Sequence, residues 1–298
     1  MNLHELVEDY VKNLDNTTAG QHTVVMSLLE RCFGHVPELA ELFDRAACGK
    51  FHHWLQTEPY AYRFGKPVYR SPATVNQKMS VVLSWWEDAF AEGHTDARPL
   101  SARGRGKLRL KTPKRSPRAW TEEQFRNILR HIKAAPECAK WNRHHLEALL
   151  QTVYYTGARI TGLLACTLQH LNDMYLYLPA EDSKTDEEKP CQVPTWLIDR
   201  LRSLYRKSGD TRLFPVPFTL PTLRGHLKRV LTAAGLPAGR RDLFHKIRRT
   251  SGTAVAKAGG IGAAQQHLGH SDPATTLCYV DPTQTETDKL KWLADLRR

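Results

Sequence analysis

Apolar residues in the first hundred positions recur at intervals of three and four, which is the spacing of amphipathic helices. The pattern predicts helices over 3–14 and 24–33, and a shorter one after Pro37. The clearest helix begins at Ser71, a capping serine followed by proline in the first turn, and ends near Gly93. Its predicted buried face consists of Val75, Met79, Val82, Leu83, Trp86 and Phe90. Since no alternating strand pattern is present, residues 1–97 are predicted to form a small all-helical bundle.

After residue 118, helical patterns surround one pair of β-prone segments. Thr121, with Gln124 in the capping-box position, predicts a helix start. The helices predicted after it cover 141–155, 195–207, 221–234 and 242–258, with short ones on either side of His270 and an amphipathic tail over 285–298. Residues 174–179 and 190–194 predict a β-hairpin with a long tip, 180–189. The predicted fold class is therefore mainly α with a small β-hairpin (α+β).

Residues 98–118 are rich in glycine, proline, arginine and lysine, and they have little apolar periodicity. We interpret them as an exposed basic linker between two domains, 1–97 and 119–298, because 298 residues can form two hydrophobic cores. Residues 101–118 contain eight Lys and Arg and no acidic residue, within a chain of net charge +12. A solvated tether and a strap lying on DNA phosphates both fit, and the absence of acids favours the strap. The candidate DNA-binding residues are Arg103, Arg105, Lys107, Arg109, Lys111, Lys114 and Arg115.

Composition excludes several other classes of protein. No apolar run approaches the roughly 20 residues of a membrane span, and the first residues lack the features of a signal peptide. We therefore expect a cytoplasmic protein with no membrane partner. The six cysteines form no closely spaced pair, so neither a disulfide framework nor a zinc knuckle is predicted.

The candidate chemistry of the chain lies in its second half. Arg159 follows a Thr-Gly turn, which would place it at a helix start where a phosphate could be held; a surface arginine beside a turn fits equally well. Lys184 lies on the predicted hairpin tip, which is also acidic, and Lys189 is a second candidate on the same hairpin. Most loop lysines are only solvated, so neither lysine is assigned by its position alone.

Further along, His245 and Arg248 are three residues apart and share one face of a predicted helix, but Arg249 fits that face too. His267 and His270 have a spacing that could bind a metal, yet no third ligand has a recognised spacing. We therefore expect one of them to cap a helix and the other to be exposed. By itself Tyr279 reads as a core aromatic, and its phenol is a poor nucleophile unless a base or cations assist it.

Together these segments resemble the tyrosine recombinase (phage integrase) family. The ordered residues that carry the resemblance are Arg159 after Thr-Gly-Ala, Lys184, His245 with Arg248, His270 after Leu-Gly, and Tyr279. The spacing from Arg159 to Lys184 is similar to that of lambda integrase, and the chain length is similar to Xer-type recombinases. The resemblance implies a SAM-like helical core-binding domain over 1–97 and a catalytic domain over 119–298 that form a clamp on DNA. It also favours Arg248 over Arg249.

The resemblance also implies a mechanism. Tyr279 would attack a DNA phosphate to form a 3′-phosphotyrosine, Arg159 and Arg248 would hold the phosphate oxygens, and His245 would accept the tyrosine proton. Lys184 would protonate the 5′-oxygen and His270 would contact the phosphate. No cofactor and no metal are expected. The expected partners are double-stranded DNA with a specific recombination site and three further copies of the chain. The C-terminal helix would dock on a neighbouring copy, and packing of this helix on its own copy fits equally well.

One position departs from the family pattern. The family usually has Glu or Asp three residues after the first arginine, where this chain has Gly162. The hypothesis favoured by the sequence is a site-specific recombinase, the integrase of a phage or other mobile element. The alternatives are an inactive DNA-binding relative, a Xer-like resolvase, and a type IB topoisomerase.

Overall fold

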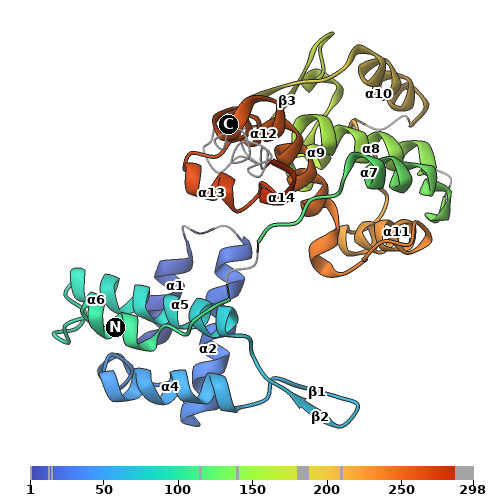
Figure 1. Ribbon diagram of the computed structural model, residues 1–298. Helices are drawn as coiled ribbons and strands as arrows, with labels where there is room; N and C mark the ends of the chain where they lie inside the picture. Colours follow the sequence, from blue (N-terminus) through green and yellow to red (C-terminus); the bar gives the residue numbers. More distant parts are fainter. Residues whose placement is uncertain are drawn as a thin grey trace, which may run out of the picture. The chain divides into compact units, whose positions relative to one another are not determined.

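The computed structural model describes residues 2–12, 14, 16–113, 116–138, 141–179, 188–208 and 211–285. The chain divides into two compact units, residues 1–114 and 115–298, which we call unit 1 and unit 2 (Figure 1). The division lies inside the segment that we interpreted from sequence as a separate linker. No helix within the described ranges is long and apolar enough to cross a membrane.

Unit 1 is a helical bundle. Its helices are α1 (Leu3–Lys12), α2 (Asn16–Phe33), α3 (Leu39–Leu42), α4 (Arg45–Thr57), α5 (Pro72–Ala91) and α6 (Ala102–Leu108). As predicted, Ser71 caps α5, because its hydroxyl accepts a hydrogen bond from the Thr74 N–H at 3.3 Å. The predicted buried face is wrong in part, since Trp85 and Ala89 are buried and Phe90 is exposed. Successive helical residues are about 100° apart, so Phe90 lies beside the stripe that Ala89 completes.

Two elements of unit 1 correct the sequence-based prediction. Strands β1 (Ala61–Arg63) and β2 (Lys66–Val68) form an antiparallel hairpin in a domain predicted to be all-helical. Helix α6 lies in the predicted linker, and the segment just after it is fixed to α5, because both groups of the Asn76 amide bond the Leu110 backbone at 2.9 Å. Two glycines in α6 weaken the helical pattern, and the strands have only three residues each, so neither element has a strong sequence signal.

Unit 2 contains the remaining elements. Its helices are α7 (Glu122–Arg130), α8 (Arg143–Thr156), α9 (Ile160–Ala165), α10 (Thr195–Ser208), α11 (Leu220–Ala233), α12 (Phe244–Leu268), α13 (Pro273–Leu277) and α14 (Pro282–Thr285), with 3-10 turns at Ile132–Ala134, Leu168–His170 and Arg240–Asp242. The predicted capping box of Thr121 and Gln124 is confirmed. So is the predicted hairpin, in which β3 (Tyr175–Leu178) pairs antiparallel with β4 (Lys189–Gln192). Most of the predicted tip, 180–189, and of the predicted tail, 285–298, lies outside the described residues, and Lys189 belongs to β4 and not to the tip.

Helices α8 and α12 run through the core of unit 2, and the chain turns that follow them position the candidate residues. Leu149 and Val153 of α8 and Ile247 of α12 are fully buried in one cluster. Helix α12 is interrupted at Gly260, where φ is 81° and ψ is 179°, and it ends at Gly269 with φ 64°. A side chain at Gly260 would be strained in this backbone conformation. The break divides α12 into an arm that carries His245 and a second arm that leads to His270.

Candidate active site

The turn between α8 and α9 places Arg159 as the sequence predicted. Gly157 ends α8 in the left-handed conformation with φ 60°, and Arg159 is the residue from which α9 starts. A Cβ atom at Gly157 would lie 2.7 Å from Nε2 of His267, so the close approach of the second arm of α12 requires glycine here. The Arg159 side chain is exposed and forms no ion pair within the described ranges.

Arg248 is buried, with 3% of its surface exposed, and it binds the backbone on both sides of the site. One guanidinium nitrogen donates to the Gly157 carbonyl, and the other donates to the Leu268 carbonyl at 2.8 Å. The buried Nε donor has no hydrogen-bond partner among the described residues. Burial, together with the charge of Arg159, lowers the pKa of Arg248 to about 10. The guanidinium is therefore rigidly held, still charged at pH 7, and has one donor without an acceptor.

His270 contacts the same guanidinium. Its Nε2 lies 3.0 Å from the second Arg248 nitrogen and accepts from it, so the ring proton is on Nδ1, which donates to the Thr276 hydroxyl at 3.0 Å. Burial and the charges of Arg248, Arg159 and Lys189 lower the pKa of His270 to about 4. The imidazole is therefore neutral at pH 7, and it can donate to a phosphate through Nε2 only after gaining a proton or exchanging its tautomer.

The ring of Tyr279 is surrounded by imidazoles and guanidinium groups. Its centre lies 4.8 Å from the His245 ring and 4.7 Å from the His270 ring. The guanidinium carbons of Arg248 and Arg249 lie 5.3 Å and 5.9 Å from that centre. Burial and the charges of Arg249, Arg248 and Arg159 lower the pKa of His245 to about 4, so this ring can accept a proton at pH 7. The half-buried phenol thus lies next to two neutral bases and two cations.

Two adjoining hollows meet at Arg159 and Arg248. One, of about 440 Å³, is lined by residues that include Arg159, Gly162, Glu188, Lys189, Arg248 and His270. The other, of about 270 Å³, is lined by residues that include Arg159, Arg224, Arg240, His245 and Arg248. Both hollows are rich in cations, and Glu188 is the one acidic residue among their described lining residues. A larger hollow of about 620 Å³ lies between α5 and α6 of unit 1 and contains no candidate catalytic residue.

Of the two candidate lysines, Lys184 lies outside the described residues, whereas Lys189 is part of the site. Lys189 begins β4, and its ammonium donates to the His267 carbonyl. Burial lowers the pKa of Lys189, and the nearby charges of Arg248 and Arg159 lower it further. Sequence spacing did not single out Lys189, because its place beside Arg248 depends on how β4 packs against the end of α12.

The two histidines at the end of α12 do not take the roles expected from sequence. The prediction that one of them is exposed is wrong, since His270 is 8% exposed and His267 is half-buried. His267 Nε2 lies 2.6 Å from the Ser251 hydroxyl, and the Arg248 guanidinium donates to the His270 ring. Side chains of the first arm of α12 therefore hold both imidazoles away from solvent. The described residues contain no group of three or more possible metal ligands.

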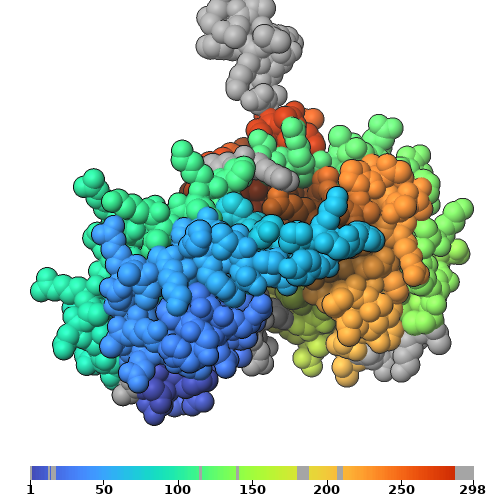
Figure 2. Space-filling view, turned by 90° about the horizontal axis from the view of Figure 1, so that it is seen from below, coloured from blue at the N-terminus to red at the C-terminus, as the bar shows by residue number. Residues whose placement is uncertain are grey.

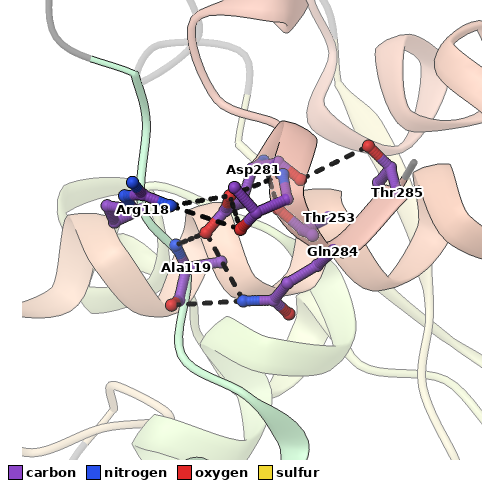
Figure 3. Close-up of polar contacts among 7 residues, drawn as sticks. Arg118, Ala119, Thr253, Asp281, Gln284 and Thr285 are labelled. Carbon is purple, nitrogen blue, oxygen red and sulfur yellow. Dashed lines mark hydrogen bonds and ion pairs between the residues drawn. The ribbon is translucent and has the colours of Figure 1, made fainter.

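Sequence reasoning missed Asp281, two residues after Tyr279 (Figure 3). Its carboxylate is 2% exposed and accepts from the Ala119 N–H at 2.9 Å and from the N–H and hydroxyl of Thr283 at 3.0 Å and 2.7 Å. Its own N–H donates to the Thr253 hydroxyl at 2.9 Å on α12. Burial raises the pKa of Asp281, but the hydrogen bonds and the charge of Arg118 outweigh it and leave the pKa below its usual value. Asp281 therefore joins the start of unit 2, α12 and the segment that carries Tyr279.

The candidate DNA-binding residues of the predicted linker are only partly described. Arg103, Arg105 and Lys107 lie on α6, and they are exposed, as are Arg109 and Lys111. Arg105 forms an ion pair with Glu87 of α5. Lys114 and Arg115 lie outside the described residues.

The model of the phage integrase family matches residues 118–286, more than half of the chain and the part that contains every candidate catalytic residue. The chain belongs to the phage integrase family. Among curated members of this family, tyrosine recombinase XerD of Staphylococcus aureus is 24% identical over 166 residues, which are 52% of this chain and 56% of that protein. The chain thus spans little more than half the length of that relative. XerD of Rickettsia conorii is 22% identical over 246 residues, covering 73% and 75% of the two chains.

Solved structures of phage integrases and related recombinases share the fold. A lambda integrase dimer bound to a COC′ core site is 19% identical, with 97% of this chain and 98% of that chain covered and a TM-score of 0.68. XerH bound to a palindromic difH substrate is 15% identical, with 99% and 84% covered and the same TM-score of 0.68. The mainly helical fold with a small antiparallel hairpin in the second half of the chain, predicted from sequence, is confirmed; the hairpin of unit 1 was not predicted.

Proposed function

We propose that this phage integrase family member is a site-specific tyrosine recombinase that cuts and rejoins DNA through a 3′-phosphotyrosine. The observation that carries the proposal is the position of the Tyr279 ring, between the His245 and His270 rings and beside the buried guanidinium of Arg248. A phenol that only filled a core would not require two neutral bases and two cations around it. A phosphate seated between Arg159 and Arg248, which line both hollows, would lie between two guanidinium groups.

In the proposed reaction the Tyr279 hydroxyl attacks the scissile phosphorus while its proton passes to His245. A bond forms between the tyrosine oxygen and phosphorus, and the bond from phosphorus to the 5′-oxygen breaks. Arg159 and Arg248 hold the non-bridging oxygens, whose charge increases in the transition state. The 5′-oxygen takes a proton from a lysine, Lys184 by resemblance. Attack by a 5′-hydroxyl of another strand reverses these steps and restores the tyrosine.

His270 takes the remaining role in this proposal. In the DNA-free protein its Nε2 accepts from Arg248, so it holds the guanidinium in place. A bound phosphate would compete for the Arg248 donor and, being negative, would raise the pKa of the imidazole. His270 would then donate to the phosphate through Nε2. Gly162 supplies no carboxylate to this arrangement, and the carbonyls of Gly157 and Leu268 hold Arg248 without one.

The wider assembly is proposed by analogy. Structures with this fold include a lambda integrase tetramer bound to a Holliday junction. We infer that four copies of this chain act on double-stranded DNA with a specific recombination site, with the two units clamping the duplex and the basic residues of 101–118 against its phosphates. The C-terminal segment would dock on a neighbouring copy. An integrase of a phage or other mobile element, associated with the nucleoid, is the role that we favour.

A covalent adduct is the decisive test. The recombination site would first be sought among inverted repeats beside the gene. It would then be built into a duplex with a nick just to the 3′ side of the scissile phosphate. Cleavage then releases a short fragment that carries the 5′-hydroxyl, so the strand cannot be rejoined. Wild type should form a covalent adduct of protein and DNA that survives a denaturing gel. Tyr279→Phe should form none, and Tyr155→Phe, a change to an exposed tyrosine of unit 2, should behave as wild type. An adduct formed by Tyr279→Phe would contradict the mechanism. Site-specific binding without any wild-type adduct would identify the alternative, an inactive DNA-binding relative.

A further inference from the structure

The β1–β2 hairpin of unit 1, residues 59–70, carries exposed aromatic rings on a basic segment. We call these residues the finger; Figure 1 shows it extending beyond the helices of unit 1, and in Figure 2 it forms a ridge continuous with that unit. Its exposed aromatic side chains are Tyr60, Tyr62, Phe64 and Tyr69. Large exposed apolar groups concentrated on one projection indicate an interaction surface.

The tip of the finger is held in an unfavourable conformation. Phe64 and Gly65 form the two-residue turn, with φ values of 51° and 74°. Such turns favour asparagine, aspartate or glycine, and a bulky residue at positive φ is strained. The Phe64 side chain is 104% exposed, so no contact with the described residues offsets this strain. Backbone strain without internal compensation is typical of residues that act on a ligand.

The charge of the finger indicates the ligand. Residues 59–70 contain three cations and no acid, whereas the rest of residues 1–100 contains six cations and thirteen acids. Arg63 lies directly opposite Lys66 in the hairpin, and like charges so placed destabilise a strand pair. Neither forms an ion pair within the described residues. Two unpaired cations flanking an exposed ring fit a polyanion with stacked bases.

The base of the finger is anchored. The Arg70 guanidinium donates to the Glu58 carbonyl at 2.9 Å and lies 5.2 Å from the Trp54 ring centre and 5.9 Å from the Tyr60 ring centre. These contacts tie the end of β2 to α4. The orientation of the finger on unit 1 is therefore fixed, which a projecting loop without such contacts would not provide.

We propose that the finger binds duplex DNA, with the Phe64 ring stacked against a base step and Arg63 and Lys66 on the flanking phosphates. The inference rests on the proposed function, because it takes DNA as the partner. It adds a contact that is separate from the candidate active site and from the basic residues of α6. An apolar wedge of this kind bends the duplex, so unit 1 would shape the DNA as well as hold it.

Three variants test this proposal with a fluorescent duplex of random sequence, about four helical turns long, as the probe. Phe64→Asn keeps a residue that tolerates positive φ but removes the ring. We expect it to weaken binding roughly 5- to 100-fold, to remove the DNA bend seen by end-to-end energy transfer, and to leave the melting temperature unchanged or raised. Arg63→Ala with Lys66→Ala should lower the slope of log affinity against log salt by about 1.8. The matched control, Lys12→Ala with Arg45→Ala, removes the same charge from two other exposed cations of unit 1 and should change the slope little.

The outcomes separate the finger from the function. Wild type that binds no DNA contradicts the proposed function itself. If wild type binds DNA, and Phe64→Asn and the double finger variant both bind it as the control variant does, the role of the finger is refuted while the proposed function stands. Loss of self-association by Phe64→Asn in sedimentation without DNA, with DNA affinity unchanged, would assign the finger to a second copy of the chain and also overturn the proposal.

Discussion

Replacing Asp281 by alanine removes the acceptor that joins three segments of unit 2. The Ala119 N–H, in the segment that enters the unit, would lose its partner at 2.9 Å while remaining buried. The N–H and hydroxyl of Thr283 would also lose a charged acceptor. The perturbation does not touch Tyr279, so its effect on the reaction would come through the position of the backbone.

The magnitude follows from these contacts. A buried donor left without an acceptor costs about 1–3 kcal/mol, and hydrogen bonds to a charged group contribute about 1.5–3 kcal/mol each when buried. Thr283 is exposed, so water replaces much of its share. We therefore expect Asp281→Ala to lower the free energy of unfolding of unit 2 by about 3 kcal/mol. Asp281→Asn keeps an oxygen for Ala119 and should cost about half as much.

Amide hydrogen exchange with increasing urea measures this effect on unit 2 alone. Peptides covering Ala119 and α12 should lose protection at lower urea in Asp281→Ala, while peptides of unit 1 should not change. Asp173→Asn is the matched control, because Asp173 forms an ion pair with Arg202 and its own side chain is 88% exposed. The control should cost less than about 0.5 kcal/mol.

The pH dependence gives a second check. Because the pKa of Asp281 is lower in the folded state, its contribution is complete above the unfolded-state pKa of about 3.9 and is lost as pH falls through the folded pKa. The difference between wild type and Asp281→Asn should thus be constant from pH 7 to 5 and shrink at lower pH. An Asp281→Ala variant within about 0.5 kcal/mol of wild type at pH 7 would refute this account of the network.

Three further predictions concern the active site. In the DNA-free protein the ring proton signals of His245 should not titrate between about pH 5.5 and 8 in nuclear magnetic resonance, and a midpoint near 6.5 would contradict the described environment. Because folding lowers the pKa of His245, protonation of this histidine below pH 6.5 should favour the unfolded state. Gly157→Ala should destabilise unit 2 by about 1–3 kcal/mol in the same exchange assay, because of its positive φ and the 2.7 Å approach to His267. If Lys184 is the general acid, Lys184→Ala should regain cleavage on DNA with sulfur in place of the scissile 5′-oxygen, since a thiolate leaves without a proton. Lys189→Ala should gain nothing from that substrate, and rescue of this variant instead would assign the acid to Lys189.

Much of this arrangement follows from local sequence signals. Ser71 and Thr121 start helices because their hydroxyls accept backbone hydrogen bonds within the next three residues, and this depends on nothing distant. The Gly157 turn before Arg159 is local in the same way. That Arg159, Arg248 and Tyr279 belong together was inferred from resemblance to a family, because no local rule brings residues 120 positions apart into contact.

The features that sequence did not predict depend on packing between segments. Lys189 was a candidate from its place on the hairpin, but its place in the site depends on β4 lying beside the end of α12, where the His267 carbonyl accepts a hydrogen bond from the Lys189 ammonium. Asp281 has no local sequence signal, because its partner Ala119 is 162 positions away in the chain. The finger has no strong sequence signal, because Phe64 occupies a turn position where glycine or asparagine is usual.

The cluster of cations around Arg248 has a consequence for handling the protein. Without DNA, Arg159, Arg248 and Lys189 repel one another in one hollow, and this repulsion opposes folding of unit 2. Any small oxyanion that fills the hollow binds only the folded state, and thus stabilises it by mass action. Sulfate or phosphate should therefore raise the melting temperature of unit 2 more than chloride at equal ionic strength. The difference in melting temperature between sulfate and chloride buffers thereby reports whether the phosphate position is filled or vacant.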